Sequence, residues 1–330
     1  MAQRDTLKGD DRNPRVEGTE QGSRPSVFAH LSFDRDVFDL SMNMRALKDN
    51  RLIEVDGERY HRELAEKEAI LAGDYRYYCQ LPPGTEAMQW ETIELLLPAM
   101  ARHYPEHFTL AIEGDRWRWT NRPLGVATPF RLGDAATLPL PPLDWLSRQV
   151  QEDLCLMDGR AEGTPLVAGH LCFAAGWCLD EMMGKSFLAI HGAVPLFAER
   201  IGQPANALME RLKAGRPVGR FNWSITGSDR LNLSPAAVTG RNDFTATMTA
   251  ADAGDRCFLR SEWQTLSRLP RTGAILFTIH TSRDPLAAVR ERPEQAARLA
   301  GLLRTMPAAI RVYKGLGPET FEAIVAYLEG

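Results

Sequence analysis

Apolar and polar residues recur with two different periods along this chain, and each period predicts a different type of element. Residues 57–73 (GERYHRELAEKEAILAG) have helical spacing, although Lys67 and Glu68 fall where the apolar face should continue. Residues 90–104 (WETIELLLPAMARHY) predict a second helix. Alternation in residues 108–121 (FTLAIEGDRWRWTN), on both sides of a Gly-Asp turn, predicts a β-hairpin.

The middle of the chain combines further helical patterns with apolar runs. Residues 27–42 predict no firm element, whereas residues 145–157 (WLSRQVQEDLCLM) favour a helix after a proline-rich connector. Residues 166–174 and 186–190 are apolar runs that favour strands. Residues 198–215 predict a helix that begins after a Gly-Gln-Pro break and ends at Lys-Ala-Gly.

The last third of the chain predicts three strands followed by two helices. The expected strands are 219–225 (GRFNWSI), 256–266 (RCFLRSEWQTL) and 273–281 (GAILFTIHT), and the expected helices are 285–306 and 318–330. Because strands and helices do not alternate regularly, the order favours an α+β fold over a doubly wound α/β fold. The polar residues 1–26 predict a disordered tail, and residues 27–330 predict a single domain.

Composition narrows the classes of function. The net charge of −4 and the pI near 6.0 provide no basic excess for a nucleic-acid partner. Nowhere do about 18 apolar residues follow one another, so we expect no membrane span. No pair among the five cysteines has CxxC spacing, which favours a reducing, cytoplasmic setting without disulfides. The cysteines are Cys79, Cys155, Cys172, Cys178 and Cys257.

Two short motifs have the wrong spacing for the chemistry that they suggest, and a third motif is absent. GKS at residues 184–186 ends like a phosphate-binding loop, but Leu179 stands where that loop needs its first glycine. Cys172 and Cys178 are six residues apart, too far for the usual paired zinc ligands, and are expected to be small buried side chains. No GxSxG nucleophile elbow occurs.

Histidine is the remaining candidate for chemistry. His30, His61, His103 and His107 stand in polar surroundings, and His280 ends an apolar run as an expected strand-end residue.

His170 and His191 stand within apolar segments, where an imidazole loses hydration unless its nitrogens find partners. A hydrogen-bonded core histidine and a metal or cofactor ligand both satisfy that requirement. Gly192 and Pro195 directly after His191 predict a strand break that turns its ring toward a cavity.

The expected strand 256–266 presents two different faces. Its alternation places Arg260, Glu262 and Gln264 on one side, opposite Leu259, Ser261 and Trp263. The polar row is typical of a solvated sheet face, of a salt bridge to a neighbouring helix, or of a reactive site.

Several blocks together resemble the heme-dependent oxidative N-demethylases. These are residues 170–195 (HLCFAAGWCLDEMMGKSFLAIHGAVP), RFNWSI, SEWQTLSRLPRTGAILFTIHTSRDPL and YKGL, within a resemblance that covers about residues 28–328. The resemblance implies a PAS-like antiparallel sheet wrapped by helices, with heme b in a pocket between them. It also implies use of O₂ to remove a methyl group from a small methylated amine as formaldehyde. Electrons would come from NADPH through flavin and iron–sulfur components of a partner reductase.

The resemblance also assigns roles to residues. It implies that His191 is the axial iron ligand, with His170 as the alternative. The residues themselves, rather than the resemblance, suggest the other roles. Lys185, near His191 in the sequence, would pair with the negative charge of a heme propionate, for which Arg220 and Arg271 are alternatives. Arg220, Asn222 and Trp223 would line the pocket, and Arg260, Glu262 and Gln264 would supply catalytic polar groups.

Two departures from the family pattern stand out. Trp263 and His280 each stand where the family usually has an arginine. Two other functions are alternatives to the demethylase hypothesis. One is a heme-binding, PAS-like sensor of gases without turnover, and the other is a small-molecule-binding protein that has lost heme.

Overall fold

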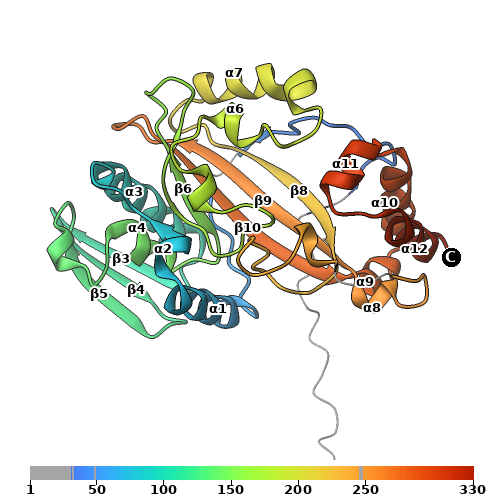
Figure 1. Ribbon diagram of the computed structural model, residues 1–330. Helices are drawn as coiled ribbons and strands as arrows, with labels where there is room; N and C mark the ends of the chain where they lie inside the picture. The colour runs from blue at the N-terminus through green and yellow to red at the C-terminus, as the bar shows by residue number, and fades with distance from the viewer. Residues whose placement is uncertain (1–30, 32, 48–49, 245–247) are drawn as a thin grey trace, which may run out of the picture.

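The computed structural model describes residues 31, 33–47, 50–244 and 248–330, and these form two antiparallel sheets with helices (Figure 1). The expected α+β class is therefore confirmed at the level of a large antiparallel sheet with flanking helices. The predicted tail, residues 1–26, lies outside the described residues.

The larger sheet has seven strands in the order β1-β8-β9-β10-β6-β7-β2, and the smaller has the order β3-β4-β5. The larger sheet consists of β1 (Arg45–Ala46), β2 (Cys79–Gln80), β6 (Asp153–Met157), β7 (Leu166–His170), β8 (Val218–Thr226), β9 (Phe258–Arg268) and β10 (Ile275–Pro285). The smaller sheet consists of β3 (Phe108–Glu113), β4 (Arg116–Asn121) and β5 (Val126–Arg131).

Three groups of helices surround the larger sheet (Figure 1). One group packs with the smaller sheet: α1 (Tyr60–Gly73), α2 (Tyr75–Tyr78), α3 (Glu86–His103) and α4 (Pro142–Ser147), with the 3₁₀ turn η2 (Ala135–Thr137) nearby. A second consists of α5 (Leu179–Met182), α6 (Phe187–Ile190), the π-helix η3 (Ala198–Gly202) and α7 (Gln203–Arg211). The C-terminal group consists of α8 (Ala253–Arg256), α9 (Leu286–Arg290), α10 (Pro293–Thr305), α11 (Ala308–Tyr313) and α12 (Pro318–Glu329), with η4 (Arg241–Asp243) between β8 and α8.

The strand register separates the two faces of the larger sheet. Leu154 lies opposite His170 and belongs to the core shared with α1, α3 and the smaller sheet, so this side is called the His170 face. Ile279 lies opposite Gln264, two residues after Glu262, and packs in the core with Met209 of α7, so the other side is called the Glu262 face. His170 and His191 therefore lie in different layers, because Phe187 and Ile190 of α6, the helix that ends at His191, pack in the same core as Ile279.

Most of the strongly periodic segments form the predicted elements. The helices predicted at 57–73 and 90–104 are α1 and α3, and the hairpin predicted at 108–121 is β3 and β4. Gly114 in the hairpin turn has φ of +62°, a conformation that glycine adopts without strain. The three C-terminal strands are β8, β9 and β10, and the closing helices are α9, α10 and α12.

Two predicted elements are wrong, and both lie near the candidate histidines. Residues 145–157 do not form one helix, because α4 ends at Ser147 and residues 153–157 form β6. Strand β6 lies between β10 and β7 with every residue buried, so both of its faces are covered and alternation disappears. Residues 186–190 are not a strand but α6, whose first turn is capped by the Ser186 hydroxyl accepting from the Ala189 N–H.

The helix predicted at 198–215 begins earlier than expected. The π-helix η3 runs through Gly202 into α7, and Pro204 is the second residue of α7. The Gly-Gln-Pro sequence is therefore part of the helix rather than its starting point.

Candidate functional site

The polar row predicted on β9 exists, and a single carboxylate holds it together. Glu262 Oε1 accepts from Arg260 Nε at 3.3 Å, and Oε2 accepts from Gln264 Nε2 at 3.0 Å. Asn222, directly opposite Glu262 on β8, donates to Oε2 at 3.2 Å. Four of the predicted site residues thus meet on the Glu262 face.

Arg260 holds the Glu262 carboxylate from the buried side of the polar row. Its side chain is 1% exposed, against 13% for Glu262, and its guanidinium donates to the Leu231 carbonyl at 2.8 Å and to the Phe173 carbonyl. A buried guanidinium with carbonyl partners and one carboxylate is well satisfied. The Glu262 carboxylate is therefore oriented by fixed donors and remains partly accessible.

Arg220 differs from Arg260 in lacking any such partner. It lies opposite Gln264 on β8, on the same face as Glu262. Across the described part of the chain its guanidinium has neither a hydrogen bond nor an ion pair, and its Nε is buried without a partner. Burial lowers the pKa of Arg220, and the Glu262 charge only partly opposes this.

Trp223 and Trp263 lie on the opposite side of their strands. The Trp223 ring packs edge-on against Phe33, with ring centroids 5.5 Å apart, and contacts the Lys314 ammonium. The structure therefore does not bring the Trp223 side chain to the face that holds Asn222 and Glu262.

The two departures from the family pattern are direct neighbours. Trp263 lies opposite His280 in the register of β9 and β10, on the His170 face. His280 is not a strand-end residue, as the sequence suggested, but stands within β10 with its Nδ1 3.0 Å from Glu152 Oε1. Both replacements thus fall on the face opposite Glu262 and leave the polar row unchanged.

His191 is the C-cap residue of α6, and only one of its two ring nitrogens has a hydrogen-bond partner among the described residues. Its Nδ1 lies 2.8 Å from the Phe187 carbonyl, so the neutral ring carries its proton on Nδ1. The imidazole stacks on Phe197, with ring centroids 4.7 Å apart at 15°. Burial lowers the pKa of His191; the Phe187 contact opposes this and the charge of Arg220 adds to it.

The backbone after His191 has two uncommon features. Leu196 has φ of +62°, which is strained for a residue with a side chain, and η3 is a π-helix. Both conformations concentrate at functional sites. This segment and α7 line a cavity of about 510 Å³ that includes His191, Phe197 and Gln203. The cavity that the sequence predicted beside His191 is thus present, next to a helix end rather than a strand end.

Lys185 lies apart from the polar row. It is exposed in the turn between α5 and α6, where its backbone carbonyl accepts from Leu166. Arg271 is also remote, because its guanidinium pairs with Glu94 beside α3.

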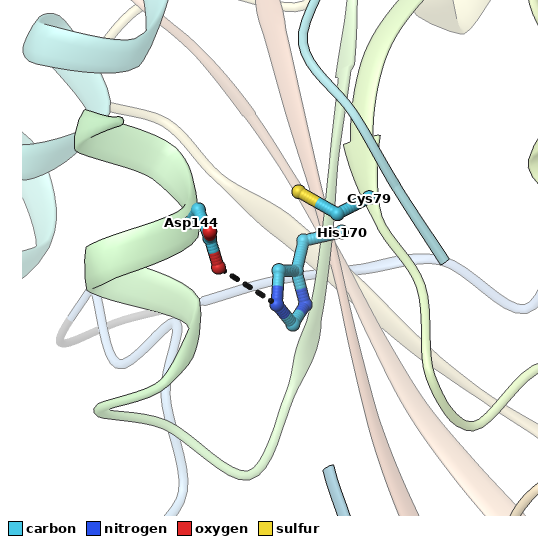
Figure 2. Close-up of side chains that lie close together, drawn as sticks. All are labelled: Cys79, Asp144 and His170. Carbon is cyan, nitrogen blue, oxygen red and sulfur yellow. Dashed lines mark ion pairs between the residues drawn. The ribbon is translucent and has the colours of Figure 1, made fainter. Parts of the chain in front are cut away.

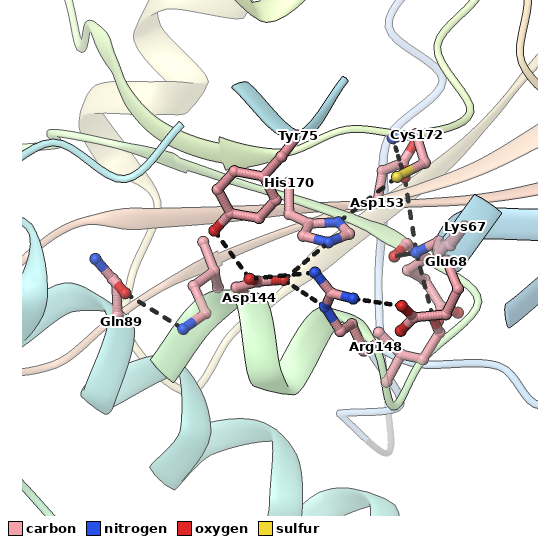
Figure 3. A network of polar contacts seen from close by, with 12 residues as sticks. Lys67, Glu68, Tyr75, Gln89, Asp144, Arg148, Asp153, His170 and Cys172 are labelled. Carbon is pink, nitrogen blue, oxygen red and sulfur yellow. Dashed lines mark hydrogen bonds and ion pairs between the residues drawn. The ribbon is translucent and has the colours of Figure 1, made fainter. Parts of the chain in front are cut away.

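His170 belongs to a buried polar network in which its Nε2 has an ion-pair contact but no hydrogen bond. It is fully buried, and its Nε2 lies 3.4 Å from Asp144 Oδ1 (Figure 2). Its Nδ1 lies 3.9 Å from the Cys172 sulfur (Figure 3). Asp144 also accepts from Tyr75 at 2.9 Å and from Arg148 Nε at 2.8 Å (Figure 3). Burial alone would raise the pKa of Asp144, but the contacts with His170 and Arg148 outweigh it and lower the pKa to about 2.

Lys67 explains the interruption in the apolar face of α1. Its ammonium is buried, donates to the carbonyls of Val150 and Glu152, and lies 3.7 Å from Asp153 Oδ1. Asp153 in turn accepts from the N–H groups of Cys172 and Phe173, both at 2.8 Å. This ion pair fastens α1 to the start of β6.

Two groups in this network have the composition of a metal site. Cys79, Asp144 and His170 form one, and Asp153, His170 and Cys172 form the other. Arg148 and Lys67 already place positive charge beside Asp144 and Asp153, however. The charges of the network are thus balanced by the chain itself.

Sequence reasoning missed Asp144 and Lys67, which are buried, and Lys314, which is half-buried. Lys67 left a detectable signal, because it interrupts an apolar face. Asp144 lies in the short helix α4 and Lys314 follows the short helix α11, so neither had a periodic context that marked it.

One known family matches most of the chain. Helices long and apolar enough to cross a bilayer do not occur within the described ranges. Residues 43–322 match the family described as haem-dependent oxidative N-demethylase, alpha subunit-like, which includes His191, Arg220 and the polar row around Glu262. The match covers most of the chain, and the chain therefore belongs to the haem-dependent oxidative N-demethylase, alpha subunit-like family.

Proposed function

We propose that this protein is a heme-dependent monooxygenase that removes a methyl group from a small methylated amine. The observation that carries the proposal is the state of His191, whose Nδ1 is held by the Phe187 carbonyl while Nε2 has no partner among the described residues. An axial histidine needs this tautomer, since one nitrogen is oriented by a hydrogen bond and the other faces the iron. The adjoining cavity of about 510 Å³ supports the same assignment.

His170 is less suited to iron. Both of its nitrogens are within 4 Å of Asp144 or Cys172, and its side chain is completely buried within the sheet. Ligation there would require Asp144 to give up a contact that helps to lower its pKa to about 2, after burial alone would have raised it. We therefore assign the axial position to His191.

The antiparallel sheet with flanking helices supports a PAS-like arrangement, and we place heme b at the cavity that His191 and the α6–α7 segment line. A b-type heme follows from the absence of a CxxCH attachment sequence, because none of the five cysteines has CxxC spacing. The cysteine content also favours a cytoplasmic setting.

The chemistry is divided between the cofactor and the chain. Bound heme would supply the iron that activates dioxygen. One oxygen atom enters the methyl group, the C–N bond breaks to give formaldehyde and the shorter amine, and the other oxygen becomes water. This balance consumes two electrons and two protons, and a flavin and iron–sulfur partner would supply the electrons.

The chain's own contribution is orientation and proton handling. The His191 Nδ1–H donates to the Phe187 carbonyl and so fixes the ring. Asn222 and Gln264 donate to the Glu262 carboxylate and hold it in place. This carboxylate is partly exposed and can accept a proton from a substrate on this face. Arg260 holds that carboxylate in place from the buried side.

The test is reconstitution with heme followed by spectroscopy and a product assay. We expect a Soret band that His191→Ala loses or shifts, while His170→Asn retains it if the protein folds. The wild-type holoprotein should release formaldehyde from dimethylamine with O₂ and an electron donor. A spectrum unaffected by His191→Ala would contradict the ligand assignment, and O₂ consumption without formaldehyde would favour a heme-binding sensor.

A further inference from the structure

Three side chains with metal-ligating atoms meet at the edge of the large sheet, on the His170 face. Cys79 of β2 lies opposite His170 of β7 in the strand register, so the two side chains point to the same side. Asp144 reaches the same place from α4 (Figure 2). The Cys79 sulfur, an Asp144 oxygen and a His170 nitrogen all lie within 4.8 Å of one another, and all three residues are buried.

The His170 Nε2 atom is the observation that points to a missing ligand. His170 is 0% exposed, yet its Nε2 has no hydrogen bond within the described ranges. Asp144 Oδ1 lies 3.4 Å away, beyond the roughly 2.7–3.2 Å of an N–H···O hydrogen bond. A nitrogen and an oxygen that bind one tetrahedral zinc ion, each at roughly 2.0–2.2 Å, are about 3.4 Å apart. The observed separation is therefore that of two ligands of one ion.

The other nitrogen of His170 favours the state that a metal requires. Nδ1 lies 3.9 Å from the Cys172 sulfur, and a hydrogen bond from Nδ1–H to this sulfur leaves the lone pair of the neutral ring on Nε2. Burial lowers the pKa of His170, although the contact with Asp144 opposes this. The imidazole is therefore neutral, as a metal-bound histidine must be.

The charges around Asp144 are compatible with a divalent cation. Arg148 balances Asp144 in the metal-free protein, but its guanidinium also pairs with Glu68, so the two carboxylates and the guanidinium sum to −1. Burial, with a smaller contribution from the charge of Asp144, raises the pKa of Cys79 to about 12, so this thiol is protonated without a metal. A divalent ion that displaces the thiol proton adds one net positive charge and brings the sum to zero.

The neighbouring group of Asp153, His170 and Cys172 suits a cation less well. The Lys67 ammonium lies 3.7 Å from Asp153 Oδ1 and already supplies the positive charge there. Both Asp153 oxygens also accept from backbone N–H groups, those of Cys172 and Phe173. An ion would have to displace these contacts, whereas the group that contains Cys79 offers a nitrogen with no hydrogen bond.

We propose that Cys79, Asp144 and His170 bind a structural Zn²⁺ ion that fastens β2 and α4 to β7. A thiolate, an imidazole and a carboxylate are the three ligand types that zinc accepts in proteins. The sulfur needs to approach by no more than about 1 Å, because zinc ligands lie about 3.6 Å from a bound thiolate. It stands on β2, a two-residue strand at the edge of the sheet.

Tyr75 provides the remaining requirements of such a site. Its hydroxyl donates to Asp144 Oδ2 at 2.9 Å, so the fourth zinc position is filled by this hydroxyl or by a water molecule. Tyr75 is 39% exposed, which gives an ion a short route from solvent. A bare ion needs no space for a macrocycle, so this site is separate from the heme proposed beside His191 and does not depend on it.

The first experiment measures zinc binding by the full chain after bound metal has been removed with a chelator. Elemental mass spectrometry gives the stoichiometry, and competition with a chromophoric chelator gives the affinity. The wild type should bind one equivalent, and Cys79→Ala should bind at least about 100-fold more weakly. Cys257→Ala changes a buried cysteine of the C-terminal core and should match the wild type. A wild type without zinc at micromolar free metal, or unchanged affinity in Cys79→Ala, would overturn the proposal.

The second experiment uses cobalt(II) to separate the loss of a ligand from the loss of folding. Co²⁺ bound to the heme-free protein gives a thiolate-to-metal charge-transfer band only if a cysteine sulfur is a ligand. We expect this band in the wild type and not in Cys79→Ala. Saturating zinc should also raise the unfolding midpoint of the wild type. If Cys79→Ala does not fold, these two wild-type measurements still decide, and the absence of either effect contradicts the site.

Two further variants locate the ion. His191→Ala should bind zinc as the wild type does, and loss of zinc in that variant would place the ion in the other cavity. Cys172→Ala should weaken binding only about 10-fold, since Cys172 orients His170 without binding the ion; a larger loss than in Cys79→Ala would overturn the choice of ligands. Zinc binding in a protein that takes up no heme would support this site and contradict only the proposed function.

Discussion

The two faces of the large sheet treat buried charge in opposite ways. Around His170, Lys67 pairs with Asp153 and Arg148 pairs with Asp144, and His170 lies between Asp144 and Cys172. On the Glu262 face, Arg220 is half-buried and forms no ion pair among the described residues, and His191 has a free nitrogen beside a cavity. The two regions therefore differ in whether their charges are paired, since each retains a buried nitrogen without a hydrogen bond: ion pairs are typical of structural support, whereas an unpaired cation indicates a place where a ligand completes the site.

The largest expected effect tests whether the His170 face is structural. Lys67→Met removes the cation beside Asp153 and leaves a buried carboxylate uncompensated, so the free energy of unfolding should fall by about 3–5 kcal/mol. Urea denaturation of the heme-free protein measures this. Lys185→Met, at an exposed position, should change it by no more than about 0.5 kcal/mol. A loss below about 1 kcal/mol for Lys67→Met would remove the contrast between the faces.

The second prediction tests the Glu262 face by activity. Glu262→Gln should lower the rate of formaldehyde release about 100-fold, or about 2.7 kcal/mol in activation free energy, while the Soret band persists. Trp263→Phe changes the adjacent residue, whose side chain points to the other face, and is the matched control. Equal rates for the two variants would mean that Glu262 does not participate in the reaction.

The third prediction compares the histidines directly. In heme-free protein, His170→Ala leaves a void in a packed core and takes a contact from Asp144, which should cost about 2–3 kcal/mol. His191→Ala removes a partly accessible ring next to an existing cavity and should cost less than about 1 kcal/mol. The order of the two unfolding midpoints in guanidinium is the decisive observation, and the reverse order would contradict the proposed division of roles.

The smallest effect is the pH dependence of the His280–Glu152 pair. Burial alone would lower the pKa of His280, but the charge of Glu152 and the hydrogen bond to it outweigh burial and raise the pKa. The pair's contribution is therefore complete below the unfolded-state value of about 6.5, and it disappears as the pH rises through the folded-state pKa.

Replacement of His280 isolates the contribution of the His280–Glu152 pair to the free energy of unfolding. The stability difference between wild type and His280→Gln should be about 1–2 kcal/mol larger at pH 5.5 than at pH 9. Unfolding measurements at both pH values check it, and a difference that grows with pH would show that the sign is wrong.

Local sequence patterns predicted a large part of the fold and of the polar row. Strict alternation in β9 correctly placed Arg260, Glu262 and Gln264 on one face, because successive side chains of a strand point to opposite sides. The same patterns failed at β6, since a central strand buried on both faces has no alternation to detect. They also failed at α6, where an N-cap and tertiary packing decided the conformation of a short apolar run.

By itself, the sequence determined the α+β class, the hairpin, the C-terminal strands and helices, and the choice of His170 and His191 as the histidines in apolar surroundings. Only the tertiary structure decided that His170 is enclosed beside Asp144 while His191 lies at a cavity, and that Arg220 forms no ion pair among the described residues. The reason is that periodicity depends on neighbours within one element, whereas charge compensation depends on groups far apart in the chain. Lys67 and Asp153 meet from separate elements, and no local pattern records that Arg220 meets nothing comparable.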